Sequence, residues 1–450
     1  MRTPRFSTKL DELPATLELV AAFDPIAIAT SLTRASGRFA LAIGSGGSLV
    51  AAEFLARCRD TLGLGPTSVA TPMTVVSDHY SLKDAQVWLF SAGANNPDAI
   101  AAARAAADRG CTDLNLITRN GDGQAAAEVR RIGGFVHVLP VADVKDGYLA
   151  THSLLSMVVG LLLASTAASR EPVGSTEPLE AIAARLTSSS DRARRERLAE
   201  AWRSLRSTDT LIVSSDPLLK PVASLLDTSL WEASLCPVQT TDFRNLAHGR
   251  HAWLHHRTDQ SVILALTGTD SRPAWSAIRD MLPNNLRHTS MDYGRCGRLE
   301  NVLGIIDGLG VIEAIGEAVG VDPGKPGIGD FGRAIYDDRS LEKLAGELPT
   351  RVRHKRSAIA KADALPPDEP SLAAIGLERL RALAAADVGG AVFDYDGTLV
   401  ATDNRFALPD NAIIKELVRL YRAGLKLGIA TGRGGSVGED LGLRRGARSA

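Results

Sequence analysis

Glycine and serine alternate in a short segment, Gly44-Ser45-Gly46-Gly47-Ser48, between an apolar run and an amphipathic one. Glycine lets the backbone turn tightly. Serine hydroxyls and the free N–H groups at the start of a helix can bind a phosphate or carboxylate. We therefore expect a strand, an anion-binding loop and a helix, with Gly44, Ser45, Gly46 and Ser48 at the ligand. The alternative is a tight turn without a ligand.

Two common phosphate-binding patterns do not fit this loop. A P-loop ends in Gly-Lys-Ser/Thr, and the dinucleotide fingerprint has a third glycine where this chain has Leu49. Asp78 follows the next apolar run and could imitate the acid that binds a nicotinamide ribose. It lies 34 residues after Gly44, however, beyond the usual position of that acid. A dinucleotide-binding domain is therefore the second choice.

Glu232 and His248 form a second group of reactive residues, separated by 16 positions and accompanied by Arg244 and Arg250. An aldose–ketose interconversion needs a carboxylate that moves a proton between two carbon atoms and a group that exchanges a proton with the ring oxygen. Glutamate and histidine meet both needs near neutral pH. The alternative is a surface acid and a structural histidine.

Three histidines near this pair, His248, His251 and His255, fall at helical spacings of three and four residues. A metal site is conceivable on that spacing alone. No cysteine is near, and the close carboxylates are Asp242 and Asp259. The mixture of imidazole and guanidinium groups therefore favours anion binding over metal binding.

Composition limits the class of protein and its partners. A chain of 450 residues should form two to three domains. Its 51 basic and 52 acidic residues give no electrostatic basis for binding nucleic acid or an anionic membrane, so the partner should be a small molecule or a protein. Four scattered cysteines, no signal-peptide core and no apolar run longer than Leu154–Ala164 indicate a cytoplasmic protein.

Alternation of short β-rich runs with helical runs predicts an α/β fold. A helical extension, 1–36, precedes a first doubly wound parallel sheet in 37–170. A linker with a solvated helix, 171–205, leads to a second such sheet in 206–345. The strands expected in the first unit are Phe39–Ile43, Met73–Val76, Val87–Ser91, Leu114–Thr118 and Phe135–Leu139; those in the second are Leu211–Ser215, Val238–Thr241, Val262–Gly268 and Leu286–Met291.

This tandem arrangement, together with its loops, resembles the sugar isomerase (SIS) domain family, best known from the isomerase half of glucosamine-6-phosphate synthase. In that family a loop after the first strand and a second Ser/Gly-rich loop bind the substrate phosphate. The second loop here is Ser91–Asp98, so the resemblance implies ligand contacts from Ser91, Asn95 and Asn96. Gly93 stands where a phosphate-binding serine is usual.

The resemblance also implies roles for the second group of residues. Glu232 would be the base that moves a proton between C1 and C2, and His248 would assist opening of the sugar ring. Arg250 replaces the usual proline and, with Arg244, makes the site more cationic. Family members associate so that a histidine of one chain completes the site of its neighbour, which implies a homodimer or a higher homo-oligomer. No cofactor is implied for these domains.

A helical linker, 346–387, is expected before a third motif, Asp394-Tyr-Asp396-Gly-Thr398. This motif resembles motif one of the haloacid dehalogenase-like (HAD) phosphohydrolases. The resemblance implies that Asp394 attacks phosphorus, that Asp396 acts as acid and base, and that both hold Mg²⁺. Thr431 matches motif two, whose hydroxyl binds the transferred phosphoryl group.

The expected HAD-like segment, 388–450, is an incomplete Rossmann-like fragment. Only 19 residues follow Thr431, and they contain no convincing lysine motif or acidic metal motif. Hydrolysis should therefore be slow or absent in this chain alone. A truncated domain, a split gene and a vestigial fragment are the alternatives.

Three functions follow from these patterns. The first is binding, with isomerisation in its stronger form, of a phosphorylated or otherwise anionic sugar derivative. The second is a non-catalytic sensor of such a ligand, which the missing hydroxyl at Gly93 favours, whereas Glu232 and His248 favour chemistry. The third is a HAD-type phosphatase, which needs motifs absent from this chain.

Overall fold

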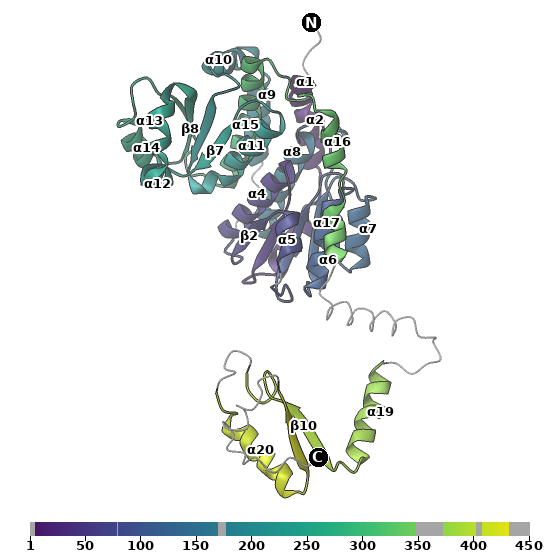
Figure 1. The fold of residues 1–450 in the computed structure, drawn as a ribbon. Coiled ribbons are helices and arrows are strands. Elements are labelled where there is room, and N and C mark those ends of the chain that lie inside the picture. Colours follow the sequence, from purple (N-terminus) through teal and green to yellow (C-terminus); the bar gives the residue numbers. More distant parts are fainter. Residues whose placement is uncertain (1–4, 79, 170–176, 347–371, 402–406, 432–450) are drawn as a thin grey trace. The chain divides into compact units, whose positions relative to one another are not determined.

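The structure, a computed structural model, describes residues 5–78, 80–169, 177–346, 372–401 and 407–431. The chain forms two compact units, Met1–Leu348 and Pro349–Ala450. The first unit contains two parallel sheets and the second contains a pair of parallel strands (Figure 1). This is the α/β architecture that the alternating sequence pattern predicts.

The first sheet has the strand order β2-β1-β3-β4-β5, and all its strands are parallel. Its inner strands β1, β3 and β4 consist entirely of buried residues, as strands covered by helices on both faces should. The strands are β1 (Ala40–Ile43), β2 (Thr67–Ala70), β3 (Gln86–Phe90), β4 (Asp113–Thr118) and β5 (Phe135–Val138).

Helices cover both faces of this sheet because successive side chains of each strand point to opposite faces. Ala42 and Trp88 pack with α4 and α8, whereas Leu41 and Leu89 pack with α6 and α7. The helices of this half are α1 (Arg5–Asp11), α2 (Leu13–Ala21), α3 (Ile26–Arg34), α4 (Gly47–Thr61), α5 (Pro72–Ser77), α6 (Pro97–Asp108), α7 (Gln124–Arg131) and α8 (His152–Ala168).

One predicted strand, Met73–Val76, is wrong, because these residues belong to helix α5. Thr71 caps the helix by accepting the N–H of Thr74, and Pro72 occupies the first turn, where proline is tolerated. Asp78 therefore follows a helix and does not follow a strand of the sheet. It cannot take the position of a ribose-binding acid, so the dinucleotide alternative loses its support.

The second sheet has the order β7-β6-β8-β9, also entirely parallel. The order is that of the first sheet: the second strand along the chain, β7, lies at the edge beside the first, β6, and the third, β8, lies on the other side of β6. The strands are β6 (Thr210–Ser215), β7 (Val238–Thr241), β8 (Ser261–Thr267) and β9 (Arg287–Asp292); the helices are α11 (Lys220–Glu232), α12 (Phe243–Asn245), α13 (Ala252–Arg257), α14 (Arg272–Arg279) and α15 (Arg298–Val319).

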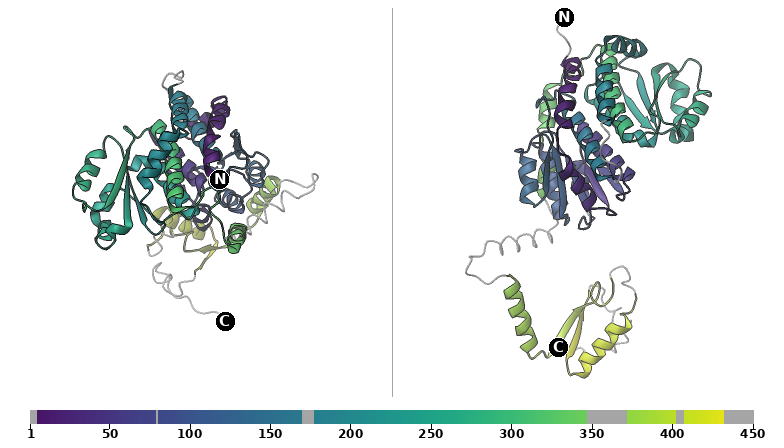
Figure 2. Two further views of the ribbon diagram at one scale, coloured as in Figure 1. Left: turned by 90° about the horizontal axis from the view of Figure 1, so that it is seen from above. Right: turned by 180° about the vertical axis from the view of Figure 1, so that it is seen from behind.

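Four helices lie between the two sheets and give them a common core. α4 contacts α8, α11 and α15, and α11 also contacts α15. Their buried apolar side chains form one continuous cluster with residues of both sheets. Figures 1 and 2 show this helical layer from the front and from two further directions. This packing holds α11 of the second half against α4 of the first half.

The segment expected to be a solvated linker, 171–205, is instead packed where it is described. It forms α9 (Glu177–Ser189) and α10 (Arg192–Trp202), and both helices contact α15. Arg185 and Arg194 each pair with Asp307, a buried residue of α15, at 2.6 and 2.5 Å. Two of the arginines in this segment therefore pair with a buried carboxylate, whereas Arg192 remains 93% exposed.

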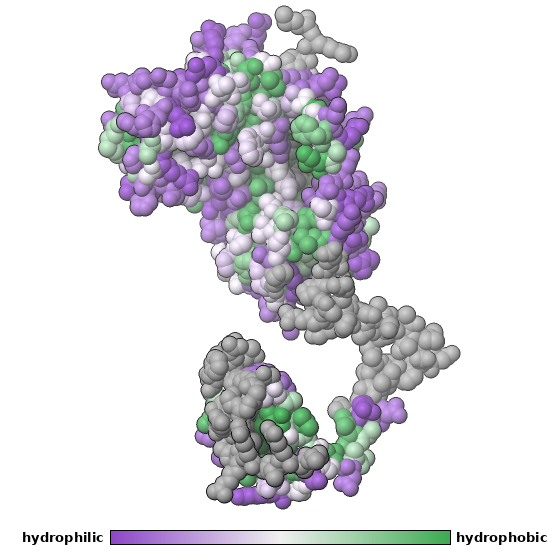
Figure 3. Space-filling view, in the orientation of Figure 1, coloured by the Kyte–Doolittle hydropathy of each residue, from purple (hydrophilic) through white to green (hydrophobic). Residues whose placement is uncertain are grey.

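Two short helices, α16 (Asp330–Tyr336) and α17 (Ser340–Gly346), complete the first unit. α17 packs on α6, whereas α16 exposes Phe331 and Ile335, so that an apolar patch is visible over it (Figure 3). Among the described helices, none is by itself long and apolar enough to cross a membrane. One pair bent by 73°, Arg5–Ala21 with Ile26–Arg34, would pass on length and composition alone.

The second unit contains α19 (Leu372–Ala385), β10 (Gly390–Asp394), α20 (Asn411–Arg422) and β11 (Lys426–Ala430). The two strands pair in parallel, with Asp394 opposite Ala430. Phe393 packs against apolar residues of α20, whereas Val392 on the opposite face is 74% exposed. Helix α20 therefore covers one face of the strand pair.

Candidate functional site

The loop between β1 and α4 has the geometry of an anion-binding turn. Gly46 has φ 53° and ψ −134°, a conformation that favours glycine, and it precedes the helix without a side-chain cap. A Cβ at Gly44 would lie 2.4 Å from the backbone oxygen of Ser48, so a side chain cannot fit there. The N–H groups of Ser48 and Leu49 donate to the backbone oxygens of Ser45 and Gly46 at 3.1 and 2.9 Å, so the turn itself uses two of the first N–H groups of α4. The helix start has no side-chain cap, and a ligand at this turn would meet the N–H of Gly47.

The second predicted loop lies at the same edge of the sheet. Ile43 of β1 pairs with Leu89 of β3, so Ser45 and Ser91 each lie two residues beyond that pair. The chain order of the strands changes direction between β1 and β3, and open parallel sheets bind ligands at such a point. The structure thus brings the two serine loops together, as the sequence predicts, while their contact with a ligand stays a prediction.

Asn95 and Asn96 also lie at this edge, but their side-chain oxygens hold the protein itself. Asn96 Oδ1 accepts the N–H of Asp98 at 2.7 Å, and Asn95 Oδ1 accepts the N–H of Gln124 at 3.1 Å. These bonds fix the first turns of α6 and α7. Their predicted contact with a ligand is untested. A Cβ at Gly93 would contact nothing within 4 Å, so the loop has room for the missing serine.

Glu232, the last residue of α11, reaches the first loop from the other half of the unit. A Cβ placed on Gly46 would lie 2.6 Å from Glu232 Oε1, so the carboxylate fills the space beside that glycine. The Thr228 hydroxyl donates to Glu232 Oε1 at 3.0 Å. Solvent reaches part of the side chain, yet the protein atoms around the carboxylate desolvate it and raise its pKa above 4.5.

Thr228 and Glu53 are neighbouring residues that the sequence analysis missed. Thr228 lies one helical turn before Glu232, and this spacing is the signal that could have found it. Glu53 lies on α4, where burial raises its pKa and the charge of Lys220 opposes that rise. The α4–α11 contact thus carries two carboxyl groups whose ionisation burial disfavours.

His248, Arg244 and Arg250 lie elsewhere within one chain. Helix α11 runs back along the sheet and ends before β7 begins, whereas these three residues follow the end of β7. Glu232 and His248 therefore lie at opposite edges of the second sheet. All three residues are exposed, and Arg250 Nη1 donates to the backbone oxygen of Thr240 at 2.9 Å. One chain does not assemble the predicted Glu232–His248 pair.

The continuous helix assumed for the spacing of His248, His251 and His255 is not present. Gly249 has non-helical backbone angles inside the segment Leu246–Arg250, so the chain is kinked before the helix Ala252–Arg257 begins. Among the residues described by the structure, these histidines are not part of a group whose ligand atoms converge. The spacing argument fails because it assumes a continuous helix.

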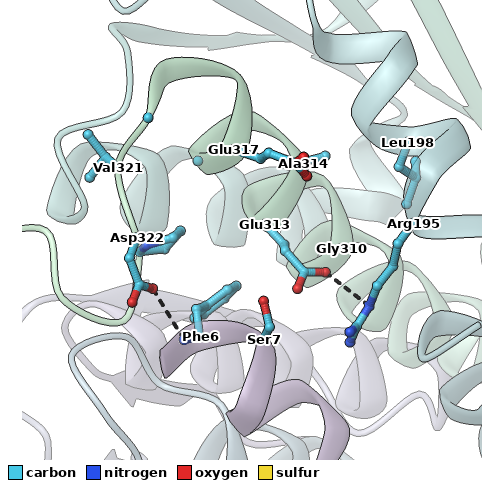
Figure 4. A pocket seen from close by; sticks show the side chains of 13 residues that line it. Phe6, Ser7, Arg195, Leu198, Gly310, Glu313, Ala314, Glu317, Val321 and Asp322 are labelled. Atoms are coloured by element: carbon cyan, nitrogen blue, oxygen red, sulfur yellow. Dashed lines mark hydrogen bonds and ion pairs between the residues drawn. The ribbon is translucent and has the colours of Figure 1, made fainter. Parts of the chain in front are cut away.

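A prominent hollow of the first unit lies away from these residues. A cavity of about 570 Å³ is bounded by α1, α10 and α15. In Figure 4 the side chains of Arg195 and Glu313 point toward each other beside it, and their ion pair measures 3.3 Å. Burial raises the pKa of Glu313. None of the predicted site residues lines this cavity, so its size alone does not identify the site.

The motif of the second unit is assembled at one edge of its strand pair. Asp394 ends β10, and Thr431 follows Ala430, the partner of Asp394 in β11. Thr398 Oγ1 donates to Asp394 Oδ2 at 3.4 Å. Mg²⁺ is commonly held by one or two carboxylates and several waters, so Asp394 and Asp396 are residues of the type that binds it, and their contact with the ion stays a prediction. The ion would supply charge neutralisation for a phosphate. The expected absence of a lysine motif and an acidic metal motif after Thr431 falls on residues 432–450, which lie outside the described residues.

No protein-family model and no curated protein sequence matches this chain. Solved structures with a similar fold include tagatose-6-phosphate ketose/aldose isomerase from Escherichia coli, with TM-score 0.56, 14% identity and coverage of 73% of this chain and 98% of that one. Glucosamine-6-phosphate deaminase from Thermotoga maritima has TM-score 0.55 and 14% identity, covering 71% and 97%. The C-terminal domain of glucosamine-fructose-6-phosphate aminotransferase from Francisella tularensis has TM-score 0.54 and 13% identity, also covering 71% and 97%.

These similarities establish the fold. They confirm that the first unit has the architecture of phosphosugar isomerase domains, which the two serine loops indicated from the sequence. Activity must be argued from the residues of the site, because identities of 13–14% do not carry it.

Proposed function

We propose that the first unit binds a phosphorylated sugar at the carboxyl edge of its first sheet and that Glu232 moves a proton on that sugar. The observation that carries this proposal is the position of Glu232 Oε1, which fills the space beside Gly46 although the two residues come from different halves of the unit. Serine loops, an uncapped helix start and a partly desolvated carboxylate support the same function.

The geometry supports a division of labour within the site. The phosphate is held by the N–H of Gly47 at the start of α4 and by the hydroxyls of Ser45 and Ser48. Glu232 then takes the proton from C2 of an open-chain aldose and returns it to C1, while the hydroxyl proton moves from O2 to O1. The product is the ketose. A raised pKa makes the carboxylate a stronger base near neutral pH.

His248 enters this site from a second chain. Glu232 and His248 lie at opposite edges of one sheet, so a single chain cannot use both. A homodimer that places His248 and Arg250 of one chain near Glu232 of the other would complete the site, and this arrangement accords with the exposure of both residues.

Hybrid dimers test this arrangement. Glu232→Gln and His248→Ala chains, each inactive alone, are co-expressed. Because half of the dimers are then hybrids with one intact site of two, about a quarter of the wild-type activity should return. Recovery of no activity from hybrids of confirmed composition would place both residues in the site of one chain.

The proposed reaction is tested with a panel of hexose phosphates and amino-sugar phosphates. A bound ligand stabilises the folded state, by roughly 2.7 kcal/mol at a hundredfold excess over its Kd, so thermal shift selects the best candidate. That ligand is then incubated in D₂O. Because the protonated carboxylate exchanges with solvent, deuterium at C1 of the ketose, and at C2 of aldose re-formed from it, is the expected result with wild type, and none with Glu232→Gln.

The alternative function is a sensor without catalysis. Gly93 favours it, because this loop has space for a serine but no hydroxyl to hold the phosphate. A sensor would bind the selected ligand with no deuterium incorporation in wild type or variant, and that outcome would overturn the isomerase proposal. Asp394→Asn serves as the control, since the second unit has no part in the proposed exchange.

A further inference from the structure

Three side chains with metal-binding atoms meet where the N-terminal helices contact the start of α8. Glu12 lies between α1 and α2, Asp143 follows β5, and His152 is the first residue of α8. One ligand atom from each lies within 4.8 Å of the others. None of the three belongs to the site of the proposed function.

His152 supplies an observation independent of the two acids. Its side chain is completely buried, and Nδ1 lies 2.7 Å from Thr16 Oγ1, which also accepts the N–H of Ala142 at 3.0 Å. Among the described residues, Nε2 has no hydrogen-bond partner, and its distance of 3.9 Å from Glu12 Oε2 is too long for one. Buried polar atoms are normally paired, so this nitrogen requires a partner.

The contact with Thr16 determines what kind of partner fits. With the Nδ1 proton donated to Thr16, Nε2 presents its lone pair toward two carboxylates. In this tautomer the lone pair and the carboxylates repel one another, and a cation would satisfy all three. In the other tautomer Nδ1 accepts the Thr16 O–H, and the Nε2–H lies 3.9 Å from Glu12 Oε2, too far for a hydrogen bond. A metal-bound histidine usually donates its other N–H to a fixed acceptor, and Thr16 provides that acceptor here.

Lys9 shows that a positive charge is already required at the acids. Its ammonium group pairs with Asp143 and lies 4.0 Å from Glu12 Oε2. The ammonium group satisfies the carboxylates, but it donates hydrogen bonds in competition with an ion and leaves Nε2 of His152 without a partner. A metal ion would replace the ammonium group and would also engage the histidine.

We propose that Glu12, Asp143 and His152 bind a divalent transition metal ion of the Zn²⁺ class. One imidazole and two carboxylates form a three-ligand set of the kind that leaves a further position open. Bonds of about 2.1 Å in a tetrahedral shell place neighbouring ligand atoms about 3.4 Å apart, so the set must contract slightly. Glu12 is half exposed and can make that movement.

The surroundings allow both entry and a structural consequence. Glu12 and Asp143 line a cavity of about 790 Å³, through which an ion reaches the site. The loop that carries Asp143 is held by Asp146, which accepts the N–H groups of Thr151 and Ser153. Bound metal would therefore fasten the N-terminal helices to the connection between β5 and α8.

Equilibrium dialysis of the full chain against Zn²⁺, after removal of metal by a chelator, tests the proposal. All proteins in this experiment carry Asp394→Asn and Asp396→Asn, which remove the two carboxylates expected to hold Mg²⁺ in the second unit. This double variant is the background protein. We expect one bound ion fewer per chain in Glu12→Gln and in His152→Gln, and no change in His255→Gln, a control among the exposed histidines. Co²⁺ provides a second readout, because its visible absorption reports nitrogen and oxygen ligands in a four-coordinate site.

Lys9→Met provides a second test if His152→Gln, the substitution at the buried histidine, fails to fold. Removal of the competing ammonium group should lower the Kd for Zn²⁺ and increase the thermal shift that the ion produces. The Glu12 side chain is half exposed, so Glu12→Gln should fold. Equal stoichiometry in the background protein and Glu12→Gln, or no change of Kd in Lys9→Met, would overturn the proposal and leave Lys9 as the permanent partner of the acids.

Discussion

The carboxyl edges of the two sheets in the first unit share a topology and differ in chemistry. In the first sheet, β1 leads through Gly44 and Gly46 to a helix without a side-chain cap. In the second, β6 leads to Asp216, a buried residue whose side chain accepts the N–H of Leu218 at 2.8 Å. The loop of the first edge has no side-chain acceptor of its own at the helix start, whereas Asp216 supplies one at the second.

The switch point of the second sheet is also filled. A Cβ at Gly268 would lie 2.2 Å from Cys296 Sγ and 3.3 Å from Asp216 Oδ2, so side chains occupy the space where a ligand would enter. Asp292 adds a further carboxylate, and its pairing with Arg272 lowers its pKa to about 2. An anion is therefore disfavoured there. Topology identifies the edge at which a ligand could bind, and residue type decides whether it binds.

The largest expected effect comes from Glu232, the residue that the second half contributes to the first edge. Glu232→Gln should reduce the rate of deuterium exchange by about 10²–10⁴-fold, the range for loss of a general base, and should change the Kd of the sugar phosphate little. Single-turnover exchange and calorimetric titration measure the two quantities. Equal losses in rate and affinity would indicate that Glu232 only supports the start of α4.

The pH dependence of the wild-type rate provides a check on that assignment. Burial raises the pKa of Glu232 above 4.5, and the base is the ionised form. The exchange rate should therefore fall as the pH decreases through a midpoint above 4.5. A rate that is independent of pH down to 4.5 would contradict the role of Glu232 as the base.

A second comparison concerns the last strand of each sheet, which carries a buried histidine in β5, His137, and an exposed one in β9, His288. Burial lowers the pKa of His137 from 6.5 to about 4, so the unfolded chain binds the proton first as the pH falls. The free energy of unfolding that neutral His137 contributes above pH 6.5 is therefore lost as the pH falls from 6.5 to about 4. At pH 5 the loss should be about 2 kcal/mol, at about 1.4 kcal/mol for each pKa unit.

Urea unfolding at pH 7 and pH 5 measures this loss. All 5 tryptophans lie in the first unit, so their fluorescence reports its unfolding. His137→Gln should lose less stability between the two pH values than wild type does, whereas His288→Gln should behave as wild type. Equal losses in all three proteins would show that another group controls the acid sensitivity.

The smallest expected effect concerns Gly93 in the second loop of the first edge. Gly93→Ser has the space that the hydroxyl needs. One added hydrogen bond of about 0.5–1.5 kcal/mol should tighten phosphate binding by about two- to tenfold. Gly93→Ala is the matched control, because it adds the Cβ without the hydroxyl. Similar affinities for the two variants would exclude a direct contact at this position.

Much of the fold follows from local patterns. Continuous apolar runs identify central strands such as β3 and β8, because both faces of these strands are buried. The edge strand Thr67–Ala70 lacks such a run and escaped prediction, while the apolar residues after Pro72 were mistaken for a strand. Thr71 and Pro72 form a helix-start signal that outweighs those apolar residues.

The site could be predicted only in part, because its halves are distant in sequence. No local pattern relates Gly46 to Glu232, whose proximity depends on the packing of α4 against α11. The position of His248 was inferable, since a residue before a strand and a residue after it lie at opposite edges of a sheet. The packing of the 171–205 segment was not inferable, because the partner of its arginines, Asp307, lies more than 100 residues away.

The central claim is that an anion binds at the edge of the first sheet and not at that of the second. Calorimetric titration of the selected sugar phosphate into Gly46→Ala and Asp216→Asn tests it directly. Alanine at Gly46 costs about 1–3 kcal/mol in that conformation and meets Glu232, so the free loop of the variant should relax to another conformation. Because the ligand must then restore the strained one, the Kd should rise by about 5- to 150-fold. Asparagine preserves the cap at Asp216 and should leave the Kd unchanged. An unchanged Kd in Gly46→Ala, or a changed one in Asp216→Asn, would contradict the account.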